Sequence, residues 1–185
     1  MSESIGIFGG VFDPPHNGHV ALVRAAKDEL GLDRVIVLVA GDPAHKPVAT
    51  PAAVRLAMAE AAFPADEVLL DVHPRTVDTL RAHPEWTEAV FLIGADQLAE
   101  FPSWKEPDEI LRRVRLGVAA RPGYSGDRPD VPGAEDRVVF FELNQPEASS
   151  DLRAELEQDQ IPQAVAEIIE REGLYGPERG YTGPA

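Results

Sequence analysis

Two histidines and several glycines lie close together near the N-terminus, in the stretch from Gly9 to His19 (GGVFDPPHNGH). An apolar run precedes this stretch and a helical pattern follows it, which predicts a strand, a glycine turn and a helix start. The first turn of a helix offers unpaired N–H groups and a partial positive charge to an anion. Glycines let the backbone approach a phosphate closely, and His16 and His19 share one face of the first helical turn. The pattern is typical of a phosphate-binding site; the alternative is a glycine turn with two surface histidines.

Apolar runs of strand length alternate with helical patterns along the chain. The expected strands are 5–8, 34–40, 67–72, 89–93, 115–120 and 137–143. The expected helices are 19–30, 50–62 (with Thr50 as the N-cap), 76–81, 107–113, 149–157 and 161–172, and a flexible loop is expected at 125–136. This alternation indicates an α/β fold with a doubly wound parallel sheet and helices on both faces. We expect a single domain over 1–185, with the sheet in 1–145 and a small C-terminal helical segment in 146–185.

Ligands of such folds bind at the carboxyl ends of the strands, where the strand order reverses. Three turns are expected there and should line one crevice: the glycine turn, Gly94-Ala95-Asp96 and Arg121-Pro122-Gly123. Asp96, an acid just past a strand, is placed to meet a ribose hydroxyl or a metal-bound phosphate; the alternative is a helix N-cap. Trp104, in a nearby loop, either stacks on a ligand ring or fills the core.

Two further segments carry groups that bind phosphate. His45 and Lys46 follow the second expected strand and can donate to a phosphate; the alternative is an ordinary surface pair. Ser149 and Ser150 open an expected helix, with Arg153 one turn further on. The two hydroxyls either cap this helix or join its N–H groups and the guanidinium in an anion cradle.

Composition narrows the classes of function. The 185 residues include no cysteine, which excludes disulfides, thiolate metal sites and cysteine nucleophiles. The formal net charge of -15 disfavours nucleic acid as a partner, because binding its backbone needs a basic surface. No apolar run reaches membrane-spanning length and no secretory signal is visible, so we expect a cytoplasmic protein without a membrane partner. The oligomeric state stays open, a homo-oligomer included.

The stretch GGVFDPPHNGH resembles the HxGH signature of the nucleotidylyltransferase superfamily, and its form is most similar to that of the bacterial nicotinate-nucleotide adenylyltransferases. The GAD segment with Trp104-Lys105, the PAHKP loop and the SSDLR turn also resemble segments of that family, and the similarity covers nearly the whole chain. The resemblance implies a Rossmann-like enzyme that transfers AMP from ATP to nicotinate mononucleotide and releases pyrophosphate, a step of NAD biosynthesis. It also implies Mg²⁺, bound mainly through the ATP phosphates.

The resemblance implies roles for three groups of residues. The catalytic residues are His16, His19, Lys46 and Arg153. The nucleotide-binding residues are Gly9, Gly10, Phe12, Gly18, Gly94, Asp96, Ser149 and Ser150. The acceptor-binding residues are Arg75, Thr76, Trp104, Lys105 and Arg121. No residue is assigned to a dedicated metal site.

One segment departs from the family's pattern. The stretch from Asp71 to Thr76 is a few residues shorter than the family's GPSYT-type stretch, and Arg75 takes the place of the tyrosine. An arginine there favours an extra anionic group on the acceptor, whereas a tightened surface loop would leave the acceptor unchanged. Two alternatives to AMP transfer onto nicotinate mononucleotide stay open. One is transfer of AMP or CMP from ATP or CTP to another phosphate or phosphonate, and the other is a nucleotide-binding sensor without catalysis. A dehydrogenase is disfavoured, because the first turn lacks the GxGxxG spacing.

Overall fold

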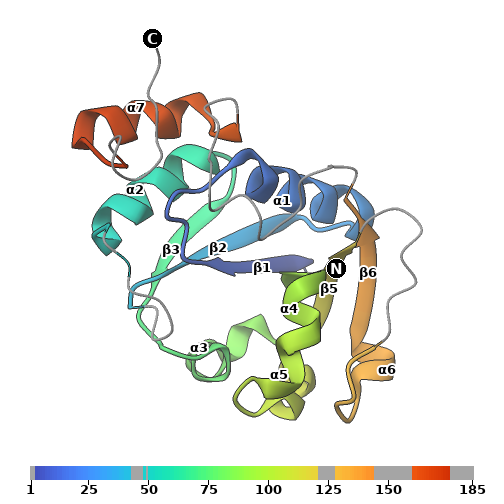
Figure 1. Ribbon diagram of the computed structural model, residues 1–185. Coiled ribbons are helices and arrows are strands. Elements are labelled where there is room, and N and C mark those ends of the chain that lie inside the picture. The colour runs from blue at the N-terminus through green and yellow to red at the C-terminus, as the bar shows by residue number, and fades with distance from the viewer. Residues whose placement is uncertain (1–2, 43–47, 49, 121–127, 144–159, 176–185) are drawn as a thin grey trace.

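A sheet of six parallel strands forms the centre of the protein, as a computed structural model shows (Figure 1). The structure describes residues 3–42, 48, 50–120, 128–143 and 160–175. The strands are β1 (Ile5–Gly10), β2 (Arg34–Ala40), β3 (Glu67–Asp71), β4 (Val90–Gly94), β5 (Arg115–Ala120) and β6 (Val138–Glu142). They lie in the order β3-β2-β1-β4-β5-β6, and every neighbouring pair is parallel. The predicted doubly wound parallel sheet is confirmed, and its strand order reverses between β1 and β4.

Helices cover both faces of this sheet (Figure 1). The helices on one face are α1 (Asn17–Leu30), α2 (Ala52–Ala62) and α7 (Gln163–Glu172), with α7 packed on α2. Those on the other face are α3 (Thr76–Ala82), α4 (Ala95–Glu100) and α5 (Pro107–Arg113). The short 3₁₀ turn η1 (Pro84–Trp86) lies between α3 and β4, and η2 (Phe101–Ser103) joins α4 to α5. A short helix, α6 (Ala134–Arg137), leads into β6. Within the described ranges, no helix is long and apolar enough to cross a membrane.

The sequence of β2 shows why the sheet is buried on both faces. Its five central residues, Val35 to Val39, are all buried. Side chains alternate along a strand, so Val35 and Val37 pack toward α1, α2 and α7, whereas Ile36 and Leu38 pack toward α3, α4 and α5. A continuous apolar run is what a parallel strand between two helical layers requires.

The structure corrects two expected boundaries near the N-terminus. Strand β1 continues through Gly9 and Gly10, so these residues end a strand and do not form a turn. Helix α1 begins at Asn17 with His16 as its N-cap, earlier than expected, and His19 therefore lies within its first turn. Glycine is compatible with both a strand end and a turn, and the pairing of Gly10 with Val39 decides for the strand.

Two further expectations are wrong. Pro51, not Thr50, is the N-cap of α2, and the Thr50 hydroxyl lies 3.3 Å from the Tyr175 hydroxyl. The loop expected at 125–136 contains the start of α6, where Ala134 is buried against the core. In both cases a tertiary contact overrides a local signal. Residues 125–127 and the expected helix 149–157 lie outside the described residues.

Gly117 of β5 lies at a point of close packing between the sheet and α1. A Cβ atom added there would lie 2.7 Å from Cγ1 of Val90 and 2.9 Å from Cδ2 of Leu92. Both neighbours are buried and cannot move without disturbing the core, so Gly117→Ala is expected to lower the free energy of unfolding by about 1–3 kcal/mol. Urea denaturation of the two proteins measures this change.

Gly9→Ala is the matched control for Gly117→Ala, because Gly9 is also a strand glycine. Its added Cβ would meet only Cζ of Phe91, at an ordinary distance of 3.5 Å. The free energy of unfolding should stay within about 0.5 kcal/mol of the wild-type value. An equal loss in both variants would contradict the packing argument.

Candidate active site

Two of the three segments predicted to bind ligand, at the ends of β1 and β4, lie at the carboxyl edge of the sheet, where the strand order reverses. In β1 and β4, Phe8 pairs with Leu92, and each strand ends two residues further on, at Gly10 and Gly94. The β1–α1 and β4–α4 connections therefore lie side by side, at the position where folds of this class bind ligands. Strand β5 lies next to β4, but the turn that begins after Ala120 lies outside the described residues.

His16 and His19 are brought together at the start of α1. Their imidazole rings stack with centroids 3.6 Å apart and an interplanar angle of 27°. The backbone N–H of His16 donates to Nδ1 of His19 at 3.1 Å, and the N–H of His19 donates to the carbonyl of His16 at 2.9 Å. Because Nδ1 of His19 accepts a hydrogen bond, the neutral ring carries its proton on Nε2. The helix start thus fixes the tautomer of this histidine and makes Nε2 a hydrogen-bond donor.

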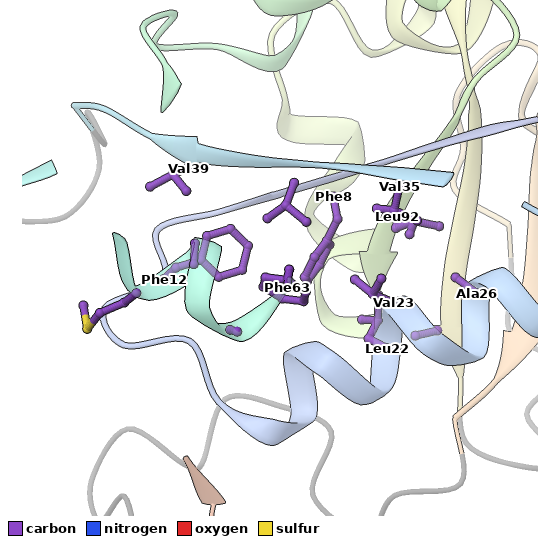
Figure 2. Packing of buried hydrophobic residues seen from close by; sticks show 14 of the residues in the cluster. Phe8, Phe12, Leu22, Val23, Ala26, Val35, Val39, Phe63 and Leu92 are labelled. Carbon is purple, nitrogen blue, oxygen red and sulfur yellow. The ribbon is translucent and has the colours of Figure 1, made fainter. Parts of the chain in front are cut away.

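Phe12 supports His19 through its buried ring. The ring is 2% exposed, and its centroid lies 5.2 Å from that of His19 and 5.8 Å from that of Phe63. Figure 2 shows the rings of Phe8, Phe12 and Phe63 packed together between the sheet and the helices α1 and α2. A nucleotide could therefore meet only the backbone of Phe12, which has a positive φ of 51°.

The two glycines that end β1 differ in what surrounds them. A Cβ on Gly10 would lie 2.8 Å from the ring of Phe12, so glycine is needed there to admit that ring. A Cβ on Gly9 would make only the ordinary contact with Phe91, so the packing of the described residues does not require glycine at this position. Gly18, the second residue of α1, is half-buried next to His19.

Asp96 lies over the end of β4. It is the second residue of α4, whose N-cap is Gly94, so the alternative reading of Asp96 as the N-cap is wrong. The carboxylate folds back over the glycine, since a Cβ on Gly94 would lie 2.6 Å from Oδ1 of Asp96. The cap is completed by Gln97, whose Oε1 accepts from the N–H of Gly94 at 3.1 Å. Asp96 is exposed, so its carboxylate is accessible at the carboxyl edge of the sheet.

The residues expected to bind the acceptor lie on the side of the sheet covered by α3 and α5. Trp104 is half-buried and packs edge-on against Phe91 of β4, with centroids 6.4 Å apart. Nζ of Lys105 lies 3.4 Å from both carboxylate oxygens of Asp78 on α3. Arg75 and Thr76 are the N-cap and the first residue of the same helix. The structure therefore brings these four predicted residues to one side of the sheet and pairs the charge of Lys105 with Asp78.

Arg55 is a residue of this region to which the sequence analysis gave no role. It is 1% exposed and donates to four backbone carbonyls, namely those of Val11 (2.8 Å), Ala40 (2.7 Å), Gly41 (3.0 Å) and Thr50 (3.1 Å). Burial lowers the pKa of its guanidinium, against the opposing effect of the nearby Asp13 carboxylate. An arginine on the apolar face of the α2 pattern is the signal that could have pointed to it.

Tyr175 also contacts the loop that carries the histidines. It follows α7, and its hydroxyl donates to the carboxylate of Asp13 and lies 3.3 Å from the Thr50 hydroxyl. Burial is the main cause that raises the pKa of Tyr175 well above its ordinary value, and Asp13 adds to it. The phenol therefore stays protonated and remains a donor at any physiological pH.

Several predicted residues lie outside the described residues, namely His45, Lys46, Arg121, Ser149, Ser150 and Arg153. In the part of the chain that the structure does describe, no three His, Asp or Glu side chains are grouped so as to hold a metal ion.

Comparison with known proteins places the chain in a family. Residues 7–155 match the family described as cytidylyltransferase-like. The chain is 40% identical to the probable nicotinate-nucleotide adenylyltransferase of Thermomicrobium roseum, over 92% of this chain and 91% of that protein. It is 35% identical to the protein of the same name from Rubrobacter xylanophilus, with the same shares covered.

A solved structure shares the fold at low sequence identity. Plasmodium falciparum nicotinic acid mononucleotide adenylyltransferase, complexed with NaAD, superposes with a TM-score of 0.73 at 16% identity, covering 94% of this chain and 98% of that one. The same enzyme complexed with APC gives a TM-score of 0.69. These likenesses confirm the Rossmann-like fold. Because the family match covers residues 7–155 and the similarity to the named relatives extends along nearly the whole length, the chain belongs to the cytidylyltransferase-like family and aligns within it with the probable nicotinate-nucleotide adenylyltransferases.

Proposed function

We propose that the protein transfers AMP from ATP to nicotinate mononucleotide and releases pyrophosphate, a step of NAD biosynthesis. The similarity to relatives of that name supports this activity. The observation that supports it most directly is the stacked pair of His16 and His19 at the reversal of strand order, with Nε2 of His19 held as a donor.

The proposed chemistry is a direct displacement at phosphorus. An oxygen of the acceptor phosphate forms a bond to the α-phosphorus of ATP, the bond from that phosphorus to the bridging oxygen breaks, and pyrophosphate leaves with the bonding electrons. A phosphate monoester is largely ionised near pH 7, so the attacking oxygen needs no strong base. The protein then contributes positioning and charge stabilisation. His16 and His19 donate to α- and β-phosphate oxygens, while Lys46 and Arg153 neutralise the charge that builds on the leaving pyrophosphate.

The remaining nucleotide-binding residues lie at the ends of β1 and β4 and in the SSDLR turn. Gly9 lets the backbone approach a phosphate closely. The packing around Gly9 does not itself require a glycine, so the missing side chain is available for this role. The exposed carboxylate of Asp96 accepts from a ribose hydroxyl. Gly18 and the amides of the first turn of α1 face the phosphates, and Ser149 and Ser150 hold the triphosphate.

The nucleotide substrate in this proposal is ATP with Mg²⁺ bound to its phosphates. The described site fits such a substrate, because Nε2 of His19 is held as a donor for a phosphate oxygen. Mg²⁺ commonly keeps several waters and binds through substrate phosphates with few protein ligands. The ion would supply charge neutralisation on the phosphates.

The acceptor is proposed to lie against α3 and the segment before α5. Trp104 borders the pyridine ring, while Arg75, Thr76, Lys105 and Arg121 meet the acceptor's anionic groups. The short segment before α3 closes on itself, since Asp71 accepts from the N–H of His73 at 2.9 Å and from the Thr79 hydroxyl at 2.7 Å. These hydrogen bonds favour the view that the shortened segment is a tightened surface turn and leaves the acceptor unchanged. Arg75 is exposed beside this turn, where it can still meet an anionic group.

Pyrophosphate release in the presence of Mg²⁺ tests the proposed function. ATP and CTP are each paired with nicotinate mononucleotide, nicotinamide mononucleotide, phosphopantetheine and no acceptor. We expect rapid release with ATP and nicotinate mononucleotide only. Release with another phosphate or phosphonate, and not with the pyridine nucleotides, would assign the acceptor to the alternative class. Tight ATP binding without release in any mixture would instead indicate a sensor.

A further inference from the structure

Four polar side chains from distant parts of the sequence lie at the loop that carries the histidines. Asp13 belongs to the β1–α1 loop, Thr50 precedes α2, Arg55 lies on α2 and Tyr175 follows α7. Arg55 and Thr50 are 1% and 5% exposed, and Asp13 is half-buried. The transfer chemistry described above uses none of these four, which together we term the loop anchor.

Arg55 joins the ends of two neighbouring strands. Its Nη1 donates to the carbonyl of Val11, just after β1, and to that of Ala40, at the end of β2. Val11 immediately precedes Phe12, whose ring packs against His19. The guanidinium therefore fixes the backbone next to Phe12, the residue whose ring supports His19. Hydrogen bonds from a buried cation are short and strong, so this fixation is rigid.

Tyr175 joins the same loop to the C-terminal helix. Its hydroxyl donates to Asp13, which lies three residues before His16. A phenol carries a single proton, so the Thr50 hydroxyl, at 3.3 Å, must donate to the Tyr175 oxygen. The two bonds run in sequence from Thr50 through Tyr175 to Asp13, and they hold the Asp13 carboxylate in one orientation.

The loop anchor also balances a buried charge. The Asp13 carboxylate acts on the buried Arg55 guanidinium as a nearby opposite charge. Removal of the Tyr175 hydroxyl leaves Asp13 with one hydrogen bond fewer in a half-buried place, and the carboxylate is then drawn toward Arg55. Such a movement displaces the loop between Val11 and His16.

We propose that Tyr175 and Arg55 are positioning residues for the AMP transfer: they hold the loop from Val11 to Asp13 so that His19 presents Nε2–H to the reacting phosphate, and Tyr175 makes this geometry depend on the C-terminal helix. The inference rests on the proposed function. It concerns the placement of His19 and not the binding of ATP.

Tyr175→Phe tests the inference by removing one oxygen while keeping the buried ring. Because a small misplacement of a reacting group can reduce a rate by up to roughly 10²-fold, we expect kcat to fall by about 10- to 100-fold, with KM for ATP within about twofold of wild type. The ¹⁵N resonances of the His19 ring should shift as the hydrogen bond from the His16 N–H to Nδ1 weakens. A purely structural role would lower the melting temperature without moving these resonances.

Thr87→Val is the control for loss of a single hydroxyl. Its Oγ1 donates to the carbonyl of Pro84 at 2.8 Å, in the connection before β4, at the sheet edge opposite the histidines. We expect wild-type kcat and unchanged His19 resonances. Arg55→Lys is the second positioning variant, because it keeps the charge but cannot reach all four carbonyls, and it should reproduce the loss of kcat.

Two results would overturn the inference: unchanged His19 resonances in Tyr175→Phe, or a wild-type kcat despite shifted resonances. The first of these can be measured even if the wild-type protein fails to turn over nicotinate mononucleotide. If the proposed function is wrong, the wild-type protein releases no pyrophosphate with ATP and nicotinate mononucleotide. If the loop anchor has no positioning role, the variants keep the wild-type His19 resonances or the wild-type kcat.

Discussion

His19→Ala is expected to lower kcat by roughly 10²- to 10³-fold, the usual consequence of removing one preorganised donor to a developing charge. The imidazole has two separate duties in the structure. Nδ1 accepts from the His16 N–H and completes the start of α1, while Nε2 is the proposed donor to phosphate. Alanine removes both, so the variant should also lose about 1 kcal/mol of unfolding free energy. Steady-state pyrophosphate release and urea denaturation measure the two losses.

His19→Asn separates the two duties. An asparagine at this position keeps a short acceptor for the His16 N–H but has no group where Nε2 lies. Its unfolding free energy should stay close to that of the wild type, while its kcat should fall as far as that of His19→Ala. Unchanged ATP binding in either variant is compatible with the mechanism, since the donor acts mainly as the phosphorus is attacked. Wild-type turnover in either variant would contradict the assignment.

Arg55→Leu is expected to cost about 3–5 kcal/mol of unfolding free energy, which is the size seen when one member of a buried charged network is removed. Leucine leaves four backbone carbonyls without their donor, at the ends of β1 and β2 and before α2. Each orphaned buried acceptor is destabilising. Since natural domains are stable by only about 5–15 kcal/mol, this loss is a large share of the total. Urea denaturation gives the change directly.

Arg112→Leu is the matched control for this prediction. Arg112 makes an i,i+4 ion pair with Asp108 on α5, and its side chain is 64% exposed. Exposed pairs of this kind contribute at most about 1 kcal/mol. Similar small losses in Arg55→Leu and Arg112→Leu would show that the buried guanidinium is not the tie between the strands.

The parts of the fold that the sequence predicted best are those with a strong periodic signal. The apolar run of β2 and the boundaries of α5 and β5 agree with the structure, because burial on both faces or on one stripe leaves a pattern in the sequence. The end of β1 and the start of α2 were less predictable. At the end of β1, glycine is compatible with both a strand and a turn. Before α2, the Thr50 hydroxyl bonds to Tyr175, a residue far along the chain, and does not cap the helix.

The candidate site likewise has features that the sequence predicts and features that it does not. The histidine pair and the placement of Asp96 at a strand end follow from local motif and topology, and the structure brings both to the carboxyl edge of the sheet. The burial of Phe12 beneath His19 and the pairing of Lys105 with Asp78 depend on tertiary packing. No periodicity encodes such contacts, so only the folded protein reveals them.

The bond from Tyr175 to Asp13 spans 162 residues of sequence. A nascent chain on the ribosome cannot make it until Tyr175 has emerged, well after the histidine loop and the sheet. Fragments that stop short of Tyr175, whether from premature termination or from proteolysis, would therefore carry the histidine loop without its bond to Tyr175. If the loop anchor acts as proposed, such fragments would transfer AMP slowly, so activity would depend on a residue that is made only after the sheet and α7.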